Sequence, residues 1–156
     1  MAVKTIKHIV VPVDGSDHAA HAAVFGAHLG ELVGARVALV FAFPASVADM
    51  IGVMGYPGVP GQAIHISEAD IERTMNQSAD KAFSSAREAI GETTADVVQE
   101  ILRGDVAEAI IDYARKHESG LIVVGSRGLS PMKELLLGSI SDKVLRHAPC
   151  PVTVVR

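Results

Sequence analysis

The chain has 156 residues, of which 49% are hydrophobic and 21% charged, and its formal net charge is −4. That length and composition predict one globular domain over residues 1–156 and exclude a disordered chain. The single cysteine, Cys150, excludes a scaffold built on internal disulfides, and no cluster of Lys and Arg indicates a nucleic-acid binder. The apolar runs are shorter than the roughly 20 residues of a membrane helix, and Pro12 and Asp14 come too early for a signal peptide. We therefore expect a cytoplasmic domain that binds neither nucleic acids nor membranes.

Short runs rich in Val, Ile and Leu alternate with longer, Ala-rich segments along the chain. The short runs are typical of buried parallel strands, and the longer segments are typical of helices. In chain order the predicted elements are strand 6–13, helix 16–33, strand 36–43, helix 67–90, strand 95–102, helix 105–117, strand 121–124, helix 139–147 and strand 151–155. With right-handed crossovers this alternation predicts an α/β fold, a single open doubly wound parallel five-stranded sheet with helices on both faces. Ligands bind such sheets beyond the carboxyl ends of the strands, where the strand order reverses.

Two features of the predicted helices are specific enough to check. In helix 16–33 the large apolar residues form one stripe at the spacing of an amphipathic helix; they are Val24, Phe25, Leu29, Leu32 and Val33. Three helix starts resemble capping boxes, in which a side chain accepts a backbone N–H three residues later. The three pairs are Ser67 with Asp70, Asp105 with Glu108, and Ser139 with Asp142.

The segment Pro44–Ile66 is too long for an ordinary connection in a compact α/β domain. Its four glycines and three prolines indicate a surface loop, whereas its apolar residues, such as Met50, Met54 and Tyr56, favour some contact with other parts of the molecule. Either a mobile loop packed in part on the fold, a lid over a ligand, or a contact with a second subunit agrees with this composition.

Two glycine-containing turns follow the fourth predicted strand. Gly125-Ser126-Arg127-Gly128 comes directly after the strand, and Gly138-Ser139 opens the last helix. Glycines let backbone N–H groups approach an anion closely, and a helix N-terminus carries partial positive charge. The two turns therefore fit a phosphate cradle, to which Arg127 could add charge and Ser126, Ser139 and Ser141 hydroxyl groups. A tight turn and a simple helix entry explain the same glycines without any ligand.

Asp14 ends the first predicted strand and precedes Gly15-Ser16. A carboxylate at this place faces the expected crevice, where it could accept from a ribose hydroxyl or hold Mg²⁺ beside phosphates. Alternatively, Asp14 or Ser16 only caps the following helix.

These motifs together resemble the universal stress protein family. The spacing Gly125-x2-Gly128-x9-Gly138-Ser139 matches the nucleotide-binding motif of that family at every fixed position. Val10–Ser16 looks like its opening strand, Ile140–Arg156 resembles its last helix and closing strand, and Arg103-Gly104-Asp105 is similar too. The resemblance covers the whole chain except Pro44–Ile66.

The resemblance implies an ATP-binding domain with sheet order 3-2-1-4-5. By position, Pro12, Val13, Phe41 and Ala42 would border the adenine, and Asp14 would meet the ribose or the metal. Phe41 departs from the family, in which His is common there. Family members also pair through their last strand, so Val152–Val155 is expected to join two subunits, as an exposed apolar edge strand would require. The residues expected around ribose and phosphates are Gly125, Gly128, Gly138, Ser139, Ile140 and Ser141.

Three functions follow from these observations. The first is an ATP-binding stress-response sensor or interaction module that hydrolyses ATP slowly at most, because no general base is evident beside Asp14. The second is a dimeric interaction protein without nucleotide, if Phe41 narrows the adenine pocket. The third is an adenylylating or ATP-hydrolysing enzyme, although Val13–Asp17 lacks the Ser-Gly-Gly-x-Asp-Ser loop or His-x-Gly-His pair of such enzymes.

The remaining polar groups have simpler interpretations. His18, His21 and His28 lie on the first helix without the spacing of a zinc site, so we interpret them as surface residues. Cys150 lies between two prolines and is expected to pack against the fold. Lys133 belongs to a solvated face or makes an auxiliary phosphate contact.

Overall fold

A computed structural model describes residues 5–44, 67–129 and 137–156 of the chain. Its strands, all parallel, are β1 (His8–Pro12), β2 (Arg36–Phe43), β3 (Val97–Arg103), β4 (Leu121–Gly125) and β5 (Val152–Val155). Its helices are α1 (Asp17–Val33), α3 (Glu68–Ile90), α4 (Val106–Lys116) and α5 (Ser139–His147). The strand order β3-β2-β1-β4-β5 confirms the predicted α/β fold and its sheet order. Within these ranges no helix is long and apolar enough to cross a membrane.

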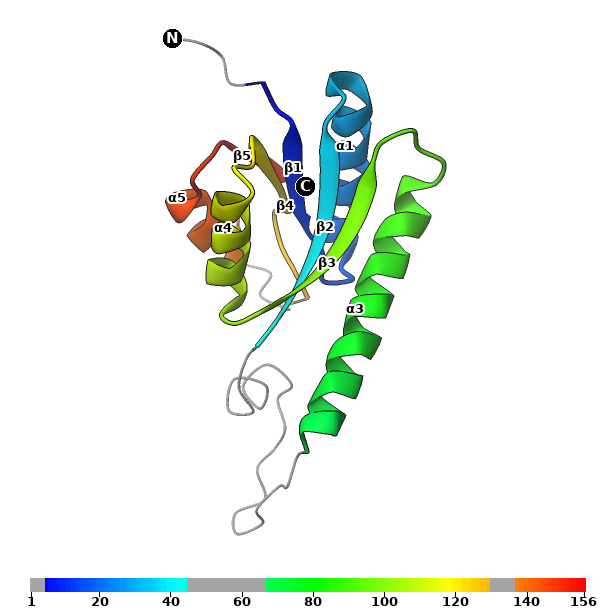
Figure 1. The fold of residues 1–156 in the computed structure, drawn as a ribbon, viewed down its shortest axis with the longest axis vertical. Helices are drawn as coiled ribbons and strands as arrows, with labels where there is room; N and C mark the ends of the chain where they lie inside the picture. The colour runs from blue at the N-terminus through cyan, green and yellow to red at the C-terminus, as the bar shows by residue number, and fades with distance from the viewer. Residues whose placement is uncertain (1–4, 45–66, 130–136) are drawn as a thin grey trace.

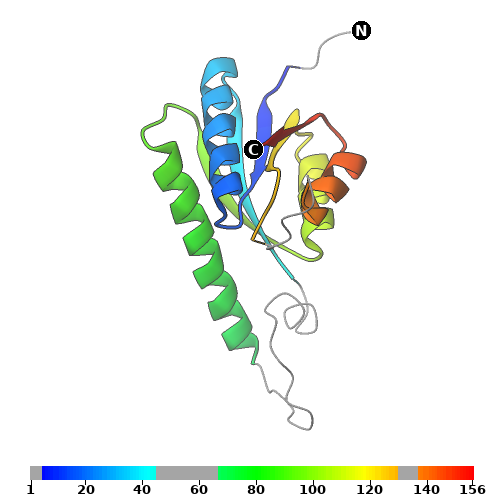
Figure 2. The same cartoon turned by 180° about the vertical axis from the view of Figure 1, so that it is seen from behind.

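The helices cover both faces of the sheet, as Figures 1 and 2 show. Side chains alternate along a strand, so Ile9 and Val11 of β1 pack with α1 and α3, whereas Val10 packs with α4 and α5. Each face therefore has its own apolar cluster. Because β1 lies between β2 and β4, the strand order reverses there, and the crevice expected to bind ligands starts after Pro12 and Gly125.

The inward face of α1 differs from the predicted one. The large apolar residues Val24, Phe25, Leu32 and Val33 are 41%, 43%, 69% and 43% exposed, and Leu29 is half-buried. Small residues face the sheet instead, because the helix lies very close to it. A Cβ at Gly26 would lie 2.6 Å from a Val11 methyl, and one at Gly30 would lie 2.5 Å from a Val37 methyl. The buried residues of α1 are Ala19, Ala22, Ala23, Gly26, Ala27 and Gly30.

Two of the three predicted helix caps are confirmed. The Ser67 hydroxyl accepts the Asp70 N–H at 3.1 Å, and the Asp105 carboxylate accepts the Glu108 N–H at 3.0 Å. The predicted Ser139 cap is wrong, because α5 starts one residue earlier: the Gly138 carbonyl accepts the Asp142 N–H at 2.9 Å, so Gly138 is the N-cap and caps without a side chain.

Two predicted features fall outside the described residues. They are residues 45–66 of the Pro44–Ile66 connection, and Lys133.

Candidate functional site

Asp14 joins the loop after β1 to the loop after β4. Its Oδ1 accepts the Ser16 N–H at 2.9 Å, and its Oδ2 accepts the Leu129 N–H at 3.2 Å. Gly15, between Asp14 and Ser16, has φ +86°, a conformation that favours glycine. The capping role considered for either residue belongs to Ser16, whose hydroxyl accepts the Ala19 N–H at 3.2 Å. Asp14 therefore holds two loops together at the carboxyl edge of the sheet.

Ser126 links the loop after β4 to both α5 and β5. Its carbonyl accepts the Gly138 N–H at 2.7 Å, and its own N–H donates to the Val155 carbonyl at 2.7 Å. The buried Ser141 hydroxyl donates to the Gly125 carbonyl at 2.7 Å. The two glycine turns that lie nine residues apart in sequence are thus adjacent in space. A phosphate that accepted from the Ser141 hydroxyl would have to displace this internal bond.

The three motif glycines have different structural reasons. At Gly125 a Cβ would lie 2.7 Å from the backbone carbon of His18, so packing against α1 requires glycine there. At Gly128 it would lie 2.5 Å from Asp14 Oδ2. At Gly138 the nearest atom would be Arg127 Cα at 3.5 Å, an ordinary contact, and φ is −67°. Within the part of the chain that the structure describes, neither packing nor backbone conformation requires glycine at position 138.

Gly138 precedes the N-terminus of α5 at the carboxyl edge of the sheet. The first intrahelical hydrogen bond of α5 is donated by the Asp142 N–H. The N–H groups of Ser139, Ile140 and Ser141 lie in the first turn, where no carbonyl of the same helix can accept them. A small residue at position 138 leaves room beside those donors. This arrangement can bind an anion through backbone N–H groups.

His18, which the sequence analysis interpreted as a surface residue, is part of this edge. Its Nδ1 lies 3.3 Å from the hydroxyl of Ser126, a residue only 3% exposed, and its ring meets that of His21 edge-on at 6.4 Å. The position of His18 in the first turn after the Ser16 cap is the only sequence signal for it. Among the described residues, no group of three or more His, Cys, Asp or Glu side chains could hold a metal ion.

The residues expected beside adenine divide between the two faces of the sheet. Val13 is buried and its N–H donates to the Val40 carbonyl at 2.9 Å, while Pro12 is half-buried. Phe41 is 8% exposed and packs on the α3 side, with its ring 6.4 Å from that of Phe83. Ala42 packs against the cluster of α4 and α5 on the opposite face. The Phe41 ring is therefore a core group.

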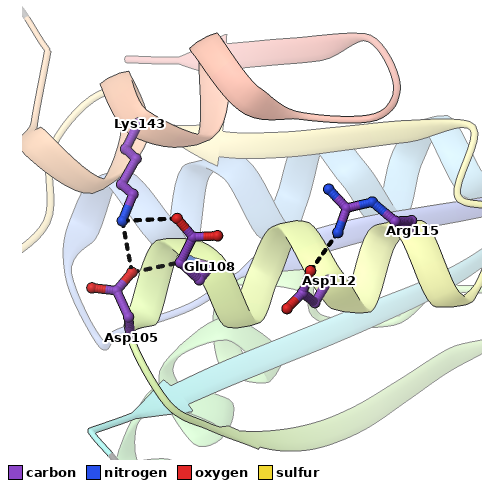
Figure 3. Close-up of polar contacts among 5 residues, drawn as sticks. All are labelled: Asp105, Glu108, Asp112, Arg115 and Lys143. Carbon is purple, nitrogen blue, oxygen red and sulfur yellow. Dashed lines mark hydrogen bonds and ion pairs between the residues drawn. The ribbon is translucent and has the colours of Figure 1, made fainter.

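Ion pairs connect α5 to the start of α4 (Figure 3). Lys143 Nζ lies 3.1 Å from Asp105 Oδ1 and 3.1 Å from Glu108 Oε1. The bonds to Glu108 and Asp105 raise the pKa of Lys143. The Glu108 N–H, and then Lys143, lower the pKa of Asp105. Because Lys143 lies one turn into α5, these contacts fix the helix N-terminus relative to α4.

Comparisons with known proteins agree with this architecture. The profile of the universal stress protein family (Usp) matches residues 5–156. A universal stress protein of Thermus aquaticus is 36% identical over 150 residues, which cover 96% of this chain and 98% of the relative. Universal stress protein YxiE of Bacillus subtilis is 31% identical over 148 residues, 95% of this chain and 97% of the relative.

Solved structures share the fold over nearly the whole chain. Universal stress protein UspA from Lactobacillus plantarum superimposes with a TM-score of 0.75 at 27% identity, covering 98% of this chain and 99% of that one. Universal stress proteins in complex with cAMP, and from Archaeoglobus fulgidus with dAMP, give TM-scores of 0.60 and 0.64, each at 22% identity. They cover 98% of this chain, and this chain covers 98% and 100% of theirs. These two universal stress proteins thus bind adenine nucleotides.

Proposed function

The chain belongs to the universal stress protein family, and from that membership we propose that it binds ATP with Mg²⁺ in the crevice beyond β1 and β4. Bound nucleotide would make it a sensor or interaction module of a stress response. The other family members crystallised with cAMP, dAMP and AMP support an adenine nucleotide as the class of ligand.

The observation that carries the proposal is the unexplained glycine at the start of α5. Among the described residues, a Cβ at position 138 would meet only ordinary contacts, yet the position is occupied by glycine at the N-terminus of α5. A phosphate group close to the backbone would account for that choice, because glycine permits close approach and the helix end favours negative charge.

The proposed contacts follow the geometry of the crevice. The N–H groups of Ser139, Ile140 and Ser141 would donate to phosphate oxygens, with Gly125, Gly128 and Gly138 leaving the space. Arg127, whose Cα lies beside Gly138, would add positive charge. Bound Mg²⁺ supplies positive charge that neutralises the phosphates, and Asp14 is the carboxylate proposed to hold it.

The adenine would lie against the edge formed by Pro12, Val13 and Ala42. Phe41 would support this wall from behind, because its ring packs with Phe83 on the α3 side. That placement weakens the idea that the Phe41 ring narrows the pocket, which was the reason to consider a protein of the same family without nucleotide.

Slow hydrolysis is the most that we propose for bound ATP. Both oxygens of Asp14 accept backbone N–H groups, and in this proposal the carboxylate also holds Mg²⁺, so we do not assign it the role of general base for an attacking water. The proposal is therefore a binding module, with the adenylylating or ATP-hydrolysing enzyme as the alternative that a turnover assay tests.

We also propose a homodimer that pairs through β5. The carbonyls of Pro151 and Val155 accept from Ile122 and Ser126 beside β4. Backbone groups alternate in direction along a strand, so the N–H and C=O groups of Val152 and Val154 point to the open edge. Such an edge pairs readily with an identical strand of a second copy.

The test is calorimetric titration of the chain with ATP and Mg²⁺, comparing Gly138→Val with the native residue. Valine should fill the space beside the helix end and weaken binding at least about tenfold, or about 1.4 kcal/mol. Gly138 serves better than Gly128, because a Cβ at Gly128 would also displace the Asp14 carboxylate.

Ala148→Val is the matched control. Ala148 lies at the other end of α5 with nearly the same backbone conformation, φ −60° and ψ 142° against −67° and 152° at Gly138. Unchanged ATP affinity in a folded Gly138→Val variant would contradict the phosphate cradle. If the native chain binds no ATP at all, the nucleotide-free interaction protein becomes the better reading.

A further inference from the structure

The exposed apolar flank of α1 lies on the side of the helix next to β5. The flank consists of Phe25, Leu29, Leu32 and Val33, of which Phe25 and Leu32 are 43% and 69% exposed. His18 precedes Phe25 by seven residues and Leu29 by eleven, so all three share one side of the helix. His18 touches Ser126 at the end of β4, and the Ser126 N–H is bonded to Val155 of β5.

The opposite side of α1 faces α3 and the start of β3. Glu31 Oε1 accepts the Thr93 hydroxyl at 2.6 Å and the Thr94 N–H at 2.7 Å, in the connection from α3 to β3. Val24 precedes Glu31 by seven residues and shares that side. Figure 2 shows α1 between α3 on one side and β5 on the other, and α1 contacts both.

On this face of the sheet β5 is incompletely covered. The described helices there are α1 and α3, and all four residues of β5 are half-buried. Val155 packs against the same apolar cluster as Leu29. The α1 flank therefore rises above the sheet beside the partly exposed face of β5, and the two surfaces are adjacent.

The backbone strip of β5 is small compared with the area that a stable dimer buries. A four-residue strand is about 13 Å long and occupies a strip about 5 Å wide, far less than the roughly 500 Å² per partner of a specific interface. The adjoining flank supplies apolar surface, since Phe25 alone leaves about 90 Å² accessible if its side chain has about 200 Å².

We infer that the α1 flank is part of the interface with a second copy of this chain. Antiparallel pairing of two β5 strands about a two-fold axis places both α1 helices on the same face of the joined sheet. Each flank then faces its counterpart above the two β5 strands, so the surface is self-complementary. This inference rests on the proposed β5 pairing and adds the helix residues that would make the pairing stable.

Analytical ultracentrifugation of the full chain tests the inference. The double variant Phe25→Glu/Leu32→Glu should raise the dimer dissociation constant at least about 100-fold, because two central apolar contacts become charged. Val24→Glu is the matched control: Val24 is 41% exposed on the same helix but on the α3 side, so this variant should dimerise like the native chain. Circular dichroism checks that all variants are folded.

Val154→Pro tests the strand separately, because it removes an N–H that points to the open edge and leaves the ladder to β4 intact. If the native chain dimerises and the flank variant keeps its affinity, the role of α1 is overturned while β5 pairing stands. If the flank variant dissociates but Val154→Pro still dimerises, the flank is supported and β5 pairing is overturned. A native chain that stays monomeric overturns both, and leaves the ATP titration as an independent result.

Discussion

The carboxyl ends of the strands and their amino ends form two opposite borders of the sheet, the carboxyl edge and the amino edge. These two borders are built from different kinds of residue. At the carboxyl edge, small residues and backbone groups meet around Asp14, Ser126 and Gly138. At the amino edge, aromatic rings pack beside α4: His8 stacks on His117 at 5.4 Å, and His117 lies 4.2 Å from Tyr113. This edge also has an open cavity, lined by residues that include His8, Glu31 and Arg36, so the two edges differ in the groups that line them.

The direction of the strands explains this difference. In a parallel sheet with helical crossovers, each helix begins at the carboxyl edge and returns to the amino edge. Partial positive charge from helix N-termini therefore collects at the first edge, and partial negative charge at the second. His117 is the C-cap residue of α4. The same chain path thus places partial positive charge at the carboxyl edge and partial negative charge at the amino edge.

The largest expected effect separates the two kinds of glycine at the carboxyl edge. Gly125→Ala should lower the free energy of unfolding by about 2–3 kcal/mol, because its Cβ would press on the backbone of His18. Gly138→Ala should cost less than about 1 kcal/mol, since its Cβ meets only ordinary contacts. Urea unfolding of both variants measures the difference. Equal costs would mean that Gly138 serves the fold rather than a ligand.

A smaller effect is expected from pH at the amino edge. Burial, and then His117 and Arg36, lower the pKa of His8 below its ordinary value of about 6.5. The folded chain therefore binds this proton less readily than the unfolded chain, so His8 contributes stability above pH 6.5 that is lost as the pH falls through the folded-state pKa.

Replacing His8 should flatten that pH dependence. His8→Gln keeps a partner for the Ser119 hydroxyl, which lies 2.7 Å from His8 Nδ1, but cannot titrate. Its urea midpoint should fall less than that of the native chain between pH 7.5 and about 5.5. His28→Gln is the control for replacing a histidine by glutamine, because 70% of the His28 side chain is exposed. Parallel profiles for native chain and His8→Gln would disprove the assignment.

The smallest effect is expected at the ion pairs of α4 and α5 (Figure 3). Lys143→Met breaks contacts near the carboxyl edge, and Arg115→Met breaks the pair with Asp112 farther along α4. Both are exposed, so each should shift the melting temperature by no more than about 2 °C. ATP affinity should distinguish them, because Lys143 links the first turns of α5 and α4, whereas the Arg115–Asp112 pair lies within α4. Equal affinities in both variants would argue against that positioning role.

Much of the fold could be predicted from the sequence because strand and helix signals agree with one another. The apolar run Arg36–Phe43 forms β2 with the predicted bounds. The segment Ser139–His147, which was predicted to be helical, forms α5 with the predicted bounds. Strand ends were less certain: the third strand starts at Val97 rather than Ala95. The order of the strands came from the family resemblance, since alternation of elements alone does not determine it.

The inward face of α1 could not be predicted from hydrophobicity. A pattern rule assigns the largest apolar residues to the core, but the distance between α1 and β1 admits only alanine and glycine. Similarly, Ser139 looks like a cap because serine caps well, yet Gly138 takes that place. The contacts of Asp14 and Ser126 join segments more than 100 residues apart, and no local pattern reports them.

Gly26 and Gly30 also determine the position of α1 along its own axis. Methyl groups of Val11 and Val37 fill the spaces beside Gly26 and Gly30, one turn apart, so α1 cannot slide along the sheet without driving a methyl into helix backbone. Ser16, the cap that accepts the Ala19 N–H, lies ten residues before Gly26, about 15 Å along the helix. The position of Asp14, whose carboxylate accepts the Ser16 N–H, therefore depends on the contacts of Gly26 and Gly30 in the core. A larger residue at Gly26 or Gly30 would move α1 and, with it, the loop of Asp14, although neither glycine lines the proposed binding site.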